Sequence, residues 1–213
     1  PSPGEQQVFE FISVVLADTE DTWNQLFQKA GYDYQAPKLV VYSGMTLTAC
    51  GTGQAASGPF YCPGDQKIYL DLSFLSELQR MGASGDLAVA YVLAHEVGHH
   101  IQTLTGISNK VRSLQSQTNQ VGANAIQVKM ELQADCLAGV WVNQTQKRTQ
   151  FLEHGDIEEA MQAASAVGDD QIMRKAGLPP RREAFTHGSS KERMSWFNKG
   201  FKIGDLAACE TGI

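Results

Sequence analysis

The sequence has no apolar run that approaches the roughly 20 residues of a membrane-spanning helix. It also has no block of lysine and arginine, and its formal net charge is −6. An acidic chain without a basic cluster is a poor partner for nucleic acid or an anionic membrane surface, so we expect neither. Because the chain begins with Pro1 rather than Met, we expect any signal or N-terminal membrane anchor to have been removed.

Cysteine is scarce, and the four cysteines form no CxxC pair, which argues against a cysteine zinc site. Cys50 and Cys62 flank a Gly/Ser-rich loop, whereas Cys136 and Cys209 lie far apart. Of the three possible pairings, the short loop favours Cys50–Cys62, which leaves Cys136–Cys209. Two disulfides are typical of an exported protein of the periplasm, cell envelope or extracellular space. The alternative is four free, buried thiols in a cytosolic enzyme.

Histidine is also rare, with five in 213 residues, yet two of them lie in one motif. His95-Glu96-Val97-Gly98-His99 is an HExxH motif at the end of an apolar segment that predicts a buried helix. Side chains at i and i+4 of a helix lie about 5–6 Å apart, so His95 and His99 can bind one Zn²⁺. Glu96 borders the metal and can serve as the general base toward water. The motif predicts zinc-assisted hydrolysis, most often of a peptide bond.

A catalytic zinc needs a third protein ligand and an open position. The extended HExxHxxGxxH motif is absent, because Gln102 and Thr105 occupy its Gly and His positions. Glu131 is the best candidate, since it lies four residues before Asp135 in a mostly apolar segment. We expect Glu131 to ligate zinc and Asp135 to accept the free N–H of a ligating histidine. Weaker candidates, each expected at a solvated helix end, are Glu153, His154, Glu158 and Glu159.

A fourth group of interest lies near the C-terminus. Ser189 and Glu192 form a capping box, which places His187 just before a helix and Arg193 one turn inside it. Either side chain can stabilise the oxyanion of peptide hydrolysis, so both are candidate catalytic residues. Arg193 can instead pair with Asp135, and both can also be ordinary surface residues. We expect His100, which points about 100° away from His99, beside the ligands or at the surface.

The patterns predict an α+β fold that is mainly helical, with a small N-terminal β-sheet, in one domain over residues 1–213. Residues 1–80 supply an N-terminal helix and the sheet, and residues 81–213 form the helical zinc-binding body. The predicted strands are Lys38–Tyr42, Thr46–Ala49 and Gln66–Leu72. The predicted helices are Val8–Ala30, a Ser73-capped helix to Met81, a Ser84-capped helix to Gly106, Ile107–Val121, Ala123–Lys147 after an interruption at Gly122, Asp156–Val167, Asp169–Ala176 and Ser189–Phe201.

Four segments together resemble the bacterial neutral zinc metallopeptidase family, and they occur in the family's order. They are Cys50 with Gly58–Pro63 and Ile68–Asp71, Ala94–His100, Glu131–Cys136 and Phe185–Ser190. The resemblance covers most of the chain from about residue 30 onward. It implies a zincin-like, gluzincin-like metalloendopeptidase that holds one Zn²⁺ per chain. It further implies an exported or envelope-anchored protein.

The same resemblance assigns roles to individual residues. His95, His99 and Glu131 would be the zinc ligands, Glu96 the base, and Asp135 the partner of a ligating histidine. His187 would assist the transition state.

A more remote likeness joins HExxH, ExxxD and a histidine six residues before an arginine to the CaaX-prenyl-protease and HtpX-like membrane peptidases. This chain departs from that group at Gly188, where a proline is usual, and it lacks several membrane helices. An intramembrane or prenylated substrate is therefore not expected.

Taken together, the motifs predict a zinc metallopeptidase that acts on a peptide or protein. Two alternatives stay open: a non-catalytic zinc-binding scaffold, and a zinc hydrolase of a non-peptide amide or ester. The retained Glu96 argues against a scaffold, because a structural zinc site is normally closed by four protein ligands and needs no base. We also expect the strand near Ile68–Asp71 to bind extended substrate by edge pairing.

Overall fold

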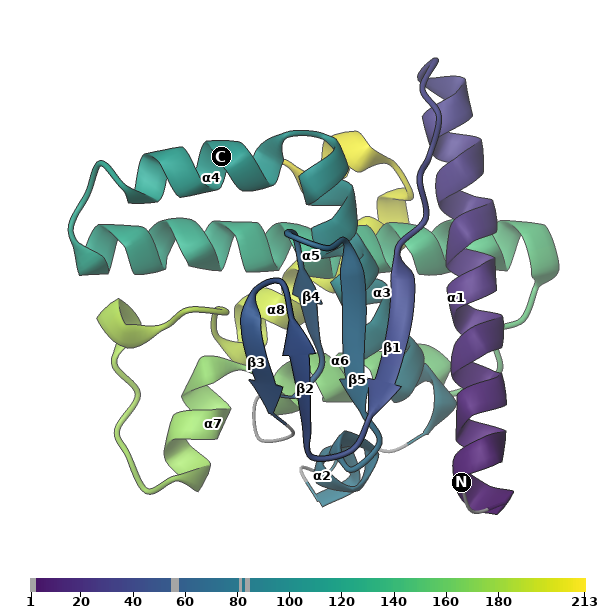
Figure 1. The fold of residues 1–213 in the computed structure, drawn as a ribbon, viewed down its shortest axis with the longest axis horizontal. Helices are drawn as coiled ribbons and strands as arrows, with labels where there is room; N and C mark the ends of the chain where they lie inside the picture. Colours follow the sequence, from purple (N-terminus) through teal and green to yellow (C-terminus); the bar gives the residue numbers. More distant parts are fainter. Residues whose placement is uncertain (1–2, 55–57, 81, 83–84) are drawn as a thin grey trace.

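The computed structural model describes residues 3–54, 58–80, 82 and 85–213. A small β-sheet region packs on one side of a larger helical body, which confirms the predicted α+β fold (Figure 1). The strands are β1 (Lys38–Tyr42), β2 (Met45–Thr48), β3 (Gly51–Gln54), β4 (Phe60–Cys62) and β5 (Lys67–Asp71). The helices are α1 (Pro3–Lys29), α2 (Phe74–Arg80), α3 (Asp86–Leu104), α4 (Ile107–Gln115), α5 (Gln120–Thr149), α6 (Asp156–Ala166), α7 (Asp169–Lys175) and α8 (Ser190–Ile203). Two 3₁₀ turns cover Arg182–Ala184 and Leu206–Cys209.

Helix α1 is a long amphipathic helix that runs beside the sheet and across α3 and α5 (Figure 1). Its buried face includes Ile12 and Trp23. The helix begins at Pro3, five residues before the predicted start. Proline is well tolerated at the first helical position, and the exposed residues of the first turns carry no apolar pattern that could reveal them.

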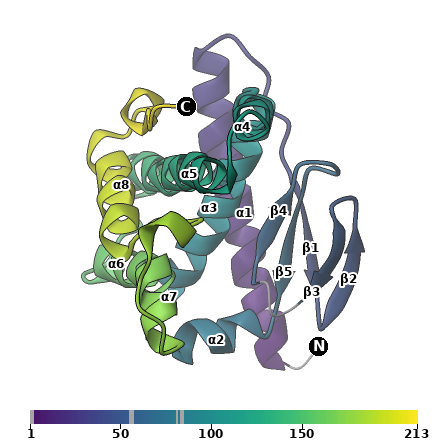
Figure 2. The ribbon, with the colours of Figure 1, turned by 90° about the vertical axis from the view of Figure 1, so that its left-hand side faces the viewer.

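The three-stranded sheet has the order β1-β5-β4, with β1 parallel and β4 antiparallel to β5. Strands β2 and β3 form a separate antiparallel hairpin. The sequence revealed β1, β2 and β5 but neither β3 nor β4, because their Gly-rich surroundings are typical of a loop. The prediction of edge pairing at Ile68–Asp71 is wrong, since β5 is the central strand. The edge strand beside α3 is β4 (Figure 2).

Two disulfides join the cysteines in the pairing that the short loop favours. Cys50 and Cys62 are bonded at 2.06 Å and enclose β3 and most of β4. Cys136 and Cys209 are bonded at 2.10 Å and attach the C-terminal turn to α5. Because Cys136 directly follows Asp135, this bond fixes the C-terminal turn to the part of α5 that carries Glu131 and Asp135.

Helices α3 and α5 form the centre of the helical body and cross at Gly98. A β-carbon at Gly98 would lie 3.1 Å from the carbonyl oxygen of Ala134, so glycine allows the two backbones to approach closely. Most apolar side chains of both helices are buried, as the apolar run before the HExxH motif indicates. The N-cap of α3 is Gly85, while the proposed cap Ser84 and the helix end at Met81 lie outside the described residues.

The division between α4 and α5 differs from the prediction. Helix α4 ends at Gln115, and α5 begins at Gln120 with Asn119 as its N-cap. Gly122 does not interrupt the helix; it lies in the first turn, where its N–H donates to Asn119 Oδ1. A good N-cap upstream therefore outweighs the weak helix propensity of one glycine.

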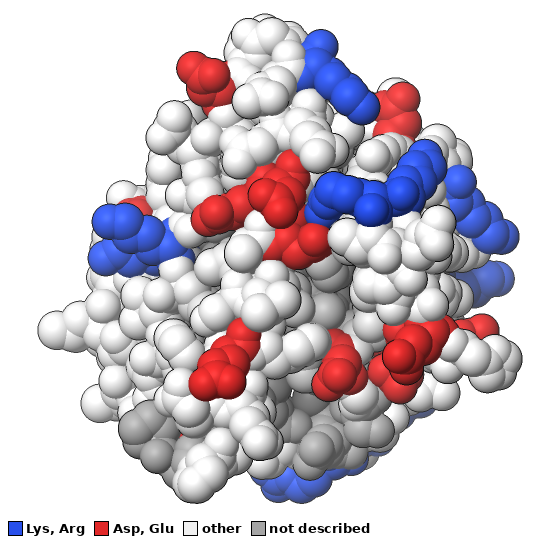
Figure 3. Space-filling model, turned by 90° about the vertical axis from the view of Figure 1, so that its right-hand side faces the viewer, with Lys and Arg blue, Asp and Glu red and all other residues white. Residues whose placement is uncertain are grey.

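On the face that α1 covers, acidic and basic side chains lie beside one another, with the basic groups mainly toward the edges (Figure 3). Asp18 and Arg148 form an ion pair that joins α1 to α5, with Arg148 Nη2 at 2.7 Å from Asp18 Oδ1. Among the described residues, no helix is both long enough and apolar enough to cross a membrane.

Candidate metal centre

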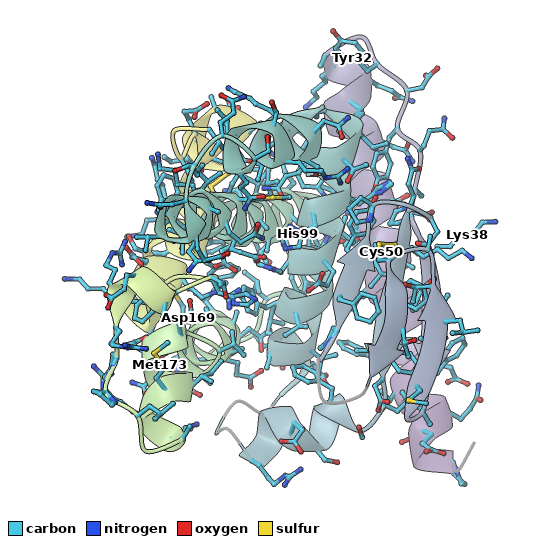
Figure 4. All side chains as sticks on the ribbon, turned by 60° about the vertical axis from the view of Figure 1, so that its left-hand side comes forward. Tyr32, Lys38, Cys50, His99, Asp169 and Met173 are labelled. Atoms are coloured by element: carbon cyan, nitrogen blue, oxygen red, sulfur yellow. A yellow bond between two sulfur atoms is a disulfide. The ribbon has the colours of Figure 1, made fainter. Side chains whose placement is uncertain are left out.

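A cleft of about 740 Å³ lies between the helical body and the β4 side of the sheet. Figure 4 shows His99 on α3, with the sheet on one side and the start of α7, marked by Asp169, on the other. The cleft is lined by Gly58, Pro59, Phe60, Tyr61, Ser73, Phe74, Glu77, Tyr91, Val92, His95, Glu96, His99, Glu131, Val167, Ile172, His187 and Arg193. Nearly all sequence-predicted site residues therefore share one cleft.

Three donor atoms converge at the floor of the cleft. His95 Nε2 lies 2.9 Å and His99 Nε2 lies 3.0 Å from the same oxygen, Glu131 Oε2. These three residues form the one group of potential metal ligands among the described part of the chain, with donor atoms within 4.8 Å of one another. The weaker ligand candidates from the sequence are not in this group: Glu153, His154, Glu158 and Glu159.

The arrangement fits a zinc ion by donor type and spacing. Two imidazole nitrogens and a carboxylate oxygen are usual zinc ligands, and donors at about 2.0–2.1 Å from a tetrahedral ion lie a little over 3 Å apart. Both histidines point their Nε2 atoms inward, and both Nδ1 atoms are hydrogen-bonded elsewhere. This is the orientation that metal-ligating histidines normally adopt.

The charge of the site also fits a divalent cation. Glu96, Glu131 and Asp135 are buried carboxylates, and Arg193 is the one buried cation of the cluster when the imidazoles are neutral. Two negative charges then remain uncompensated, and a buried charge without a partner is costly. A divalent cation would balance these two charges.

Without a metal ion, the same carboxylates act on His95 instead. Burial lowers the pKa of His95, but Asp135 and Glu131 raise that pKa to about 10.

Asp135 holds the ring of His95 from behind. Its Oδ1 lies 2.8 Å from His95 Nδ1 and also accepts the hydroxyl hydrogen of Tyr91. Arg193 Nε donates to Asp135 Oδ2 at 2.8 Å. Burial alone would raise the pKa of Asp135, but Arg193 and His95 lower it to about 2. Asp135 therefore stays ionised and favours the His95 tautomer with hydrogen on Nδ1.

Gln102 performs the equivalent role for His99, and sequence reasoning missed it. Its Oε1 lies 2.8 Å from His99 Nδ1, and its Nε2 donates to Met130 O at 2.8 Å and Gln133 Oε1 at 2.9 Å. In the sequence, Gln102 is notable only because it occupies the glycine position of the extended HExxHxxGxxH motif. Its position three residues after His99, on the same helical face, is the signal that could have identified it.

Glu96 lines the cleft without being one of the three converging donors. It is 8% exposed, and burial raises its pKa, although His99 and His95 act in the opposite direction. A carboxylate with a raised pKa is a better proton acceptor than an ordinary surface glutamate.

Arg193 lines the cleft, but its guanidinium is held by other groups of the protein. It is 4% exposed and is engaged by Asp135 and by Val167 O, to which Nη1 donates at 3.0 Å. The geometry favours the ion pair with Asp135 over contact with a substrate oxygen.

His100 is not at the surface, which corrects that part of the expectation. Its ring is fully buried, with Nδ1 at 2.8 Å from Tyr61 Oη and Nε2 at 2.5 Å from Gln35 O.

His187 lies on the wall of the cleft, in the loop before α8, and its side chain is 48% exposed. The capping box of Ser189 and Glu192 is present as predicted. Gly188 has φ +106°, which proline cannot adopt because its ring fixes φ near −65°. The departure from proline at this position therefore follows from the conformation of the loop.

The described geometry agrees with what comparison with known proteins shows. Residues 2–212 match the family described as putative neutral zinc metallopeptidase. The chain belongs to this family. It is 53% identical over 211 residues to the uncharacterized protein YpfJ of Escherichia coli K12, covering 99% of this chain and 73% of that protein.

Another member of this zinc metallopeptidase family is more distant. The chain is 40% identical over 189 residues to the uncharacterized protein Rv2575 of Mycobacterium tuberculosis H37Rv, covering 84% of this chain and 63% of that protein. No solved structure matches the chain. Family membership thus agrees with a zinc site where His95, His99 and Glu131 converge.

Replacing Gln102 tests the support that it gives to His99. We expect Gln102→Leu to weaken zinc binding by about 10- to 100-fold, as losses of such supporting groups usually do. Gln102→Glu keeps an acceptor for His99 Nδ1 and should retain most of the affinity. Competition with a chelating dye measures both.

Gln144→Leu is the matched control, because Gln144 is a half-buried glutamine that donates to Gly204 O at 2.7 Å, away from the site. Equal affinities for Gln102→Leu and Gln144→Leu, with both proteins folded by circular dichroism, would contradict the role of Gln102.

Proposed function

We propose that this protein is a zinc-dependent peptidase in which Glu96 is the general base. The proposal rests on the arrangement of side chains in the cleft. Potential ligand atoms of His95, His99 and Glu131 converge on one point, and Glu96 lines the same cleft without belonging to this group. When bound, zinc supplies a Lewis acid that polarises the scissile carbonyl and makes water easier to deprotonate.

The residues of the chain then perform the proton transfers. The carboxylate of Glu96 takes a proton from the attacking water and later delivers it to the nitrogen of the leaving amine. Burial raises the pKa of Glu96, which makes its carboxylate a stronger proton acceptor toward the attacking water. His187, on the wall of the same cleft, stabilises the negative charge that develops on the substrate oxygen.

The edge of the sheet supports a peptide as substrate. Strand β4 is an edge strand of the sheet, and Phe60 and Tyr61 within it line the cleft. An extended peptide can add to such an edge through main-chain hydrogen bonds, which fit peptides better than other amides or esters. This edge replaces the central strand β5 that the sequence pattern had indicated.

Other observations bear on the two alternatives and on location. A scaffold would normally close its zinc with four protein ligands, whereas three donors converge here among the described residues, at the floor of a cleft. The two disulfides support an exported or cell-envelope location, since such bonds persist in oxidising compartments.

The test compares zinc-loaded wild type and Glu96→Gln on a complex peptide mixture, with new termini identified by mass spectrometry. We expect the variant to bind zinc normally and to lose about 10²- to 10⁴-fold in cleavage rate, the usual contribution of a general base. Glu158→Gln, an exposed glutamate on α6, is the control and should keep full activity. Cleavage that persists in Glu96→Gln, or that chelators leave unchanged, would overturn the proposal.

A further inference from the structure

We propose that Asp169 is a positioning residue that fixes the orientation of the His187 ring in the cleft. This inference rests on the proposed function, since it assigns the group that makes His187 useful to a peptidase. Asp169 is the first residue of α7, eighteen positions before His187 in the sequence. No sequence motif pointed to it.

One carboxylate of Asp169 organises the backbone of the His187 loop. Its Oδ2 accepts three backbone N–H groups: Thr186 at 2.9 Å, His187 at 2.7 Å and Gly188 at 2.9 Å. A fourth hydrogen bond runs the other way: the backbone N–H of Asp169 donates to Gly188 O at 2.9 Å. Asp169 is 8% exposed, so the carboxylate is committed to this loop rather than to solvent.

The second oxygen of the same carboxylate faces the imidazole. Asp169 Oδ1 lies 3.3 Å from His187 Nδ1, and Thr186 Oγ1 lies 2.9 Å from the same nitrogen. Burial would raise the pKa of Asp169, but its bonds to the His187 side chain and to the backbone N–H groups of His187 and Gly188 lower it. Asp169 is thus an ionised acceptor for a hydrogen on Nδ1.

This contact selects which ring nitrogen meets the substrate. With Nδ1 directed to Asp169, Nε2 is the nitrogen left for the cleft that His187 lines. In the neutral ring Nε2 carries no hydrogen; when it takes up a proton from solvent, the resulting imidazolium can donate from Nε2 to a substrate oxygen that gains negative charge, while Asp169 faces the Nδ1 side. Without Asp169 the ring can rotate or change tautomer, and this donor is lost.

The chain offers a close control in the next residue. Asp170 also anchors the segment before α8, because its Oδ1 accepts from Ser190 N at 2.7 Å and from Ser190 Oγ at 2.9 Å. Asp170 is directed elsewhere than the imidazole, since its Oδ2 accepts from Arg174 Nη1 at 3.0 Å. A comparison of Asp169→Asn with Asp170→Asn therefore separates orientation of His187 from general support of the loop.

The first experiment is nitrogen-15 NMR of the zinc-loaded protein, which reports the hydrogen on each ring nitrogen and needs no activity. We expect the neutral His187 ring to carry its hydrogen on Nδ1 in wild type and in Asp170→Asn. This preference should be lost in Asp169→Asn. If Asp169→Asn keeps the wild-type tautomer, or if Thr186→Val alone removes it, the proposal is overturned.

The second experiment is a double-mutant cycle on peptide cleavage. We expect Asp169→Asn to lower kcat by at least about 10-fold with little change in KM, and to have no further effect in a His187→Ala background. A purely structural role would instead lower activity by the same factor in both backgrounds. That outcome, or equal losses in Asp169→Asn and Asp170→Asn, would contradict the proposal.

The two measurements distinguish this inference from the proposed function. If wild type cleaves no peptide while the NMR spectra change as expected, the proposed function fails and Asp169 still orients His187. If wild type is active and the NMR spectra do not depend on Asp169, the inference fails and the peptidase proposal stands.

Discussion

The close approach of α3 and α5 at Gly98 is the contact on which the rest of the site depends. Gly98 lies between His95 and His99, and its neighbour across the interface, Ala134, lies one turn after Glu131. A β-carbon at Gly98 would lie 3.1 Å from Ala134 O and 3.2 Å from Ala134 Cα, a tight contact with the backbone of the helix that carries Glu131. The glycine of this HExxH motif is therefore part of the metal-site geometry, because it sets the distance between the two helices that supply all three donors.

The close approach of the two helices also buries several carboxylates near one another. The helices bring Glu131, Asp135 and Glu96 into the protein interior, where Arg193 neutralises one of the three carboxylates. When the imidazoles are neutral, as zinc ligands must be, two buried carboxylates lack a cationic partner, so the cluster suits a divalent cation where the donors converge. Asp135 and Gln102 then fix the two rings that face this point. Metal binding and the packing of α3 on α5 thus stabilise each other.

Much of this site could be predicted from local sequence patterns. The i, i+4 spacing of His95 and His99 and of Glu131 and Asp135 follows from helix geometry alone, and both helices were recognisable by their apolar segments. The two residues that were missed escaped for different reasons. Asp169 meets His187 through tertiary packing, and Gln102 has no charge or motif to mark it.

The errors in the fold have the same physical origin as the omission of Asp169. Strands β3 and β4 are short and surrounded by glycine, so their pairing depends on partners that periodicity cannot reveal. The central place of β5 follows from which strands pair with it, and a single strand pattern does not specify this. Arg193 could be placed near Asp135 or near the substrate, and only the three-dimensional arrangement favours the ion pair.

The central claim is that one zinc ion binds where His95, His99 and Glu131 converge. Anomalous diffraction at the zinc edge from crystals of the zinc-loaded protein tests it most directly. The account predicts one strong peak within about 2.0–2.1 Å of His95 Nε2, His99 Nε2 and a Glu131 oxygen. A peak elsewhere, or a zinc ion that Glu131 does not contact, would contradict it.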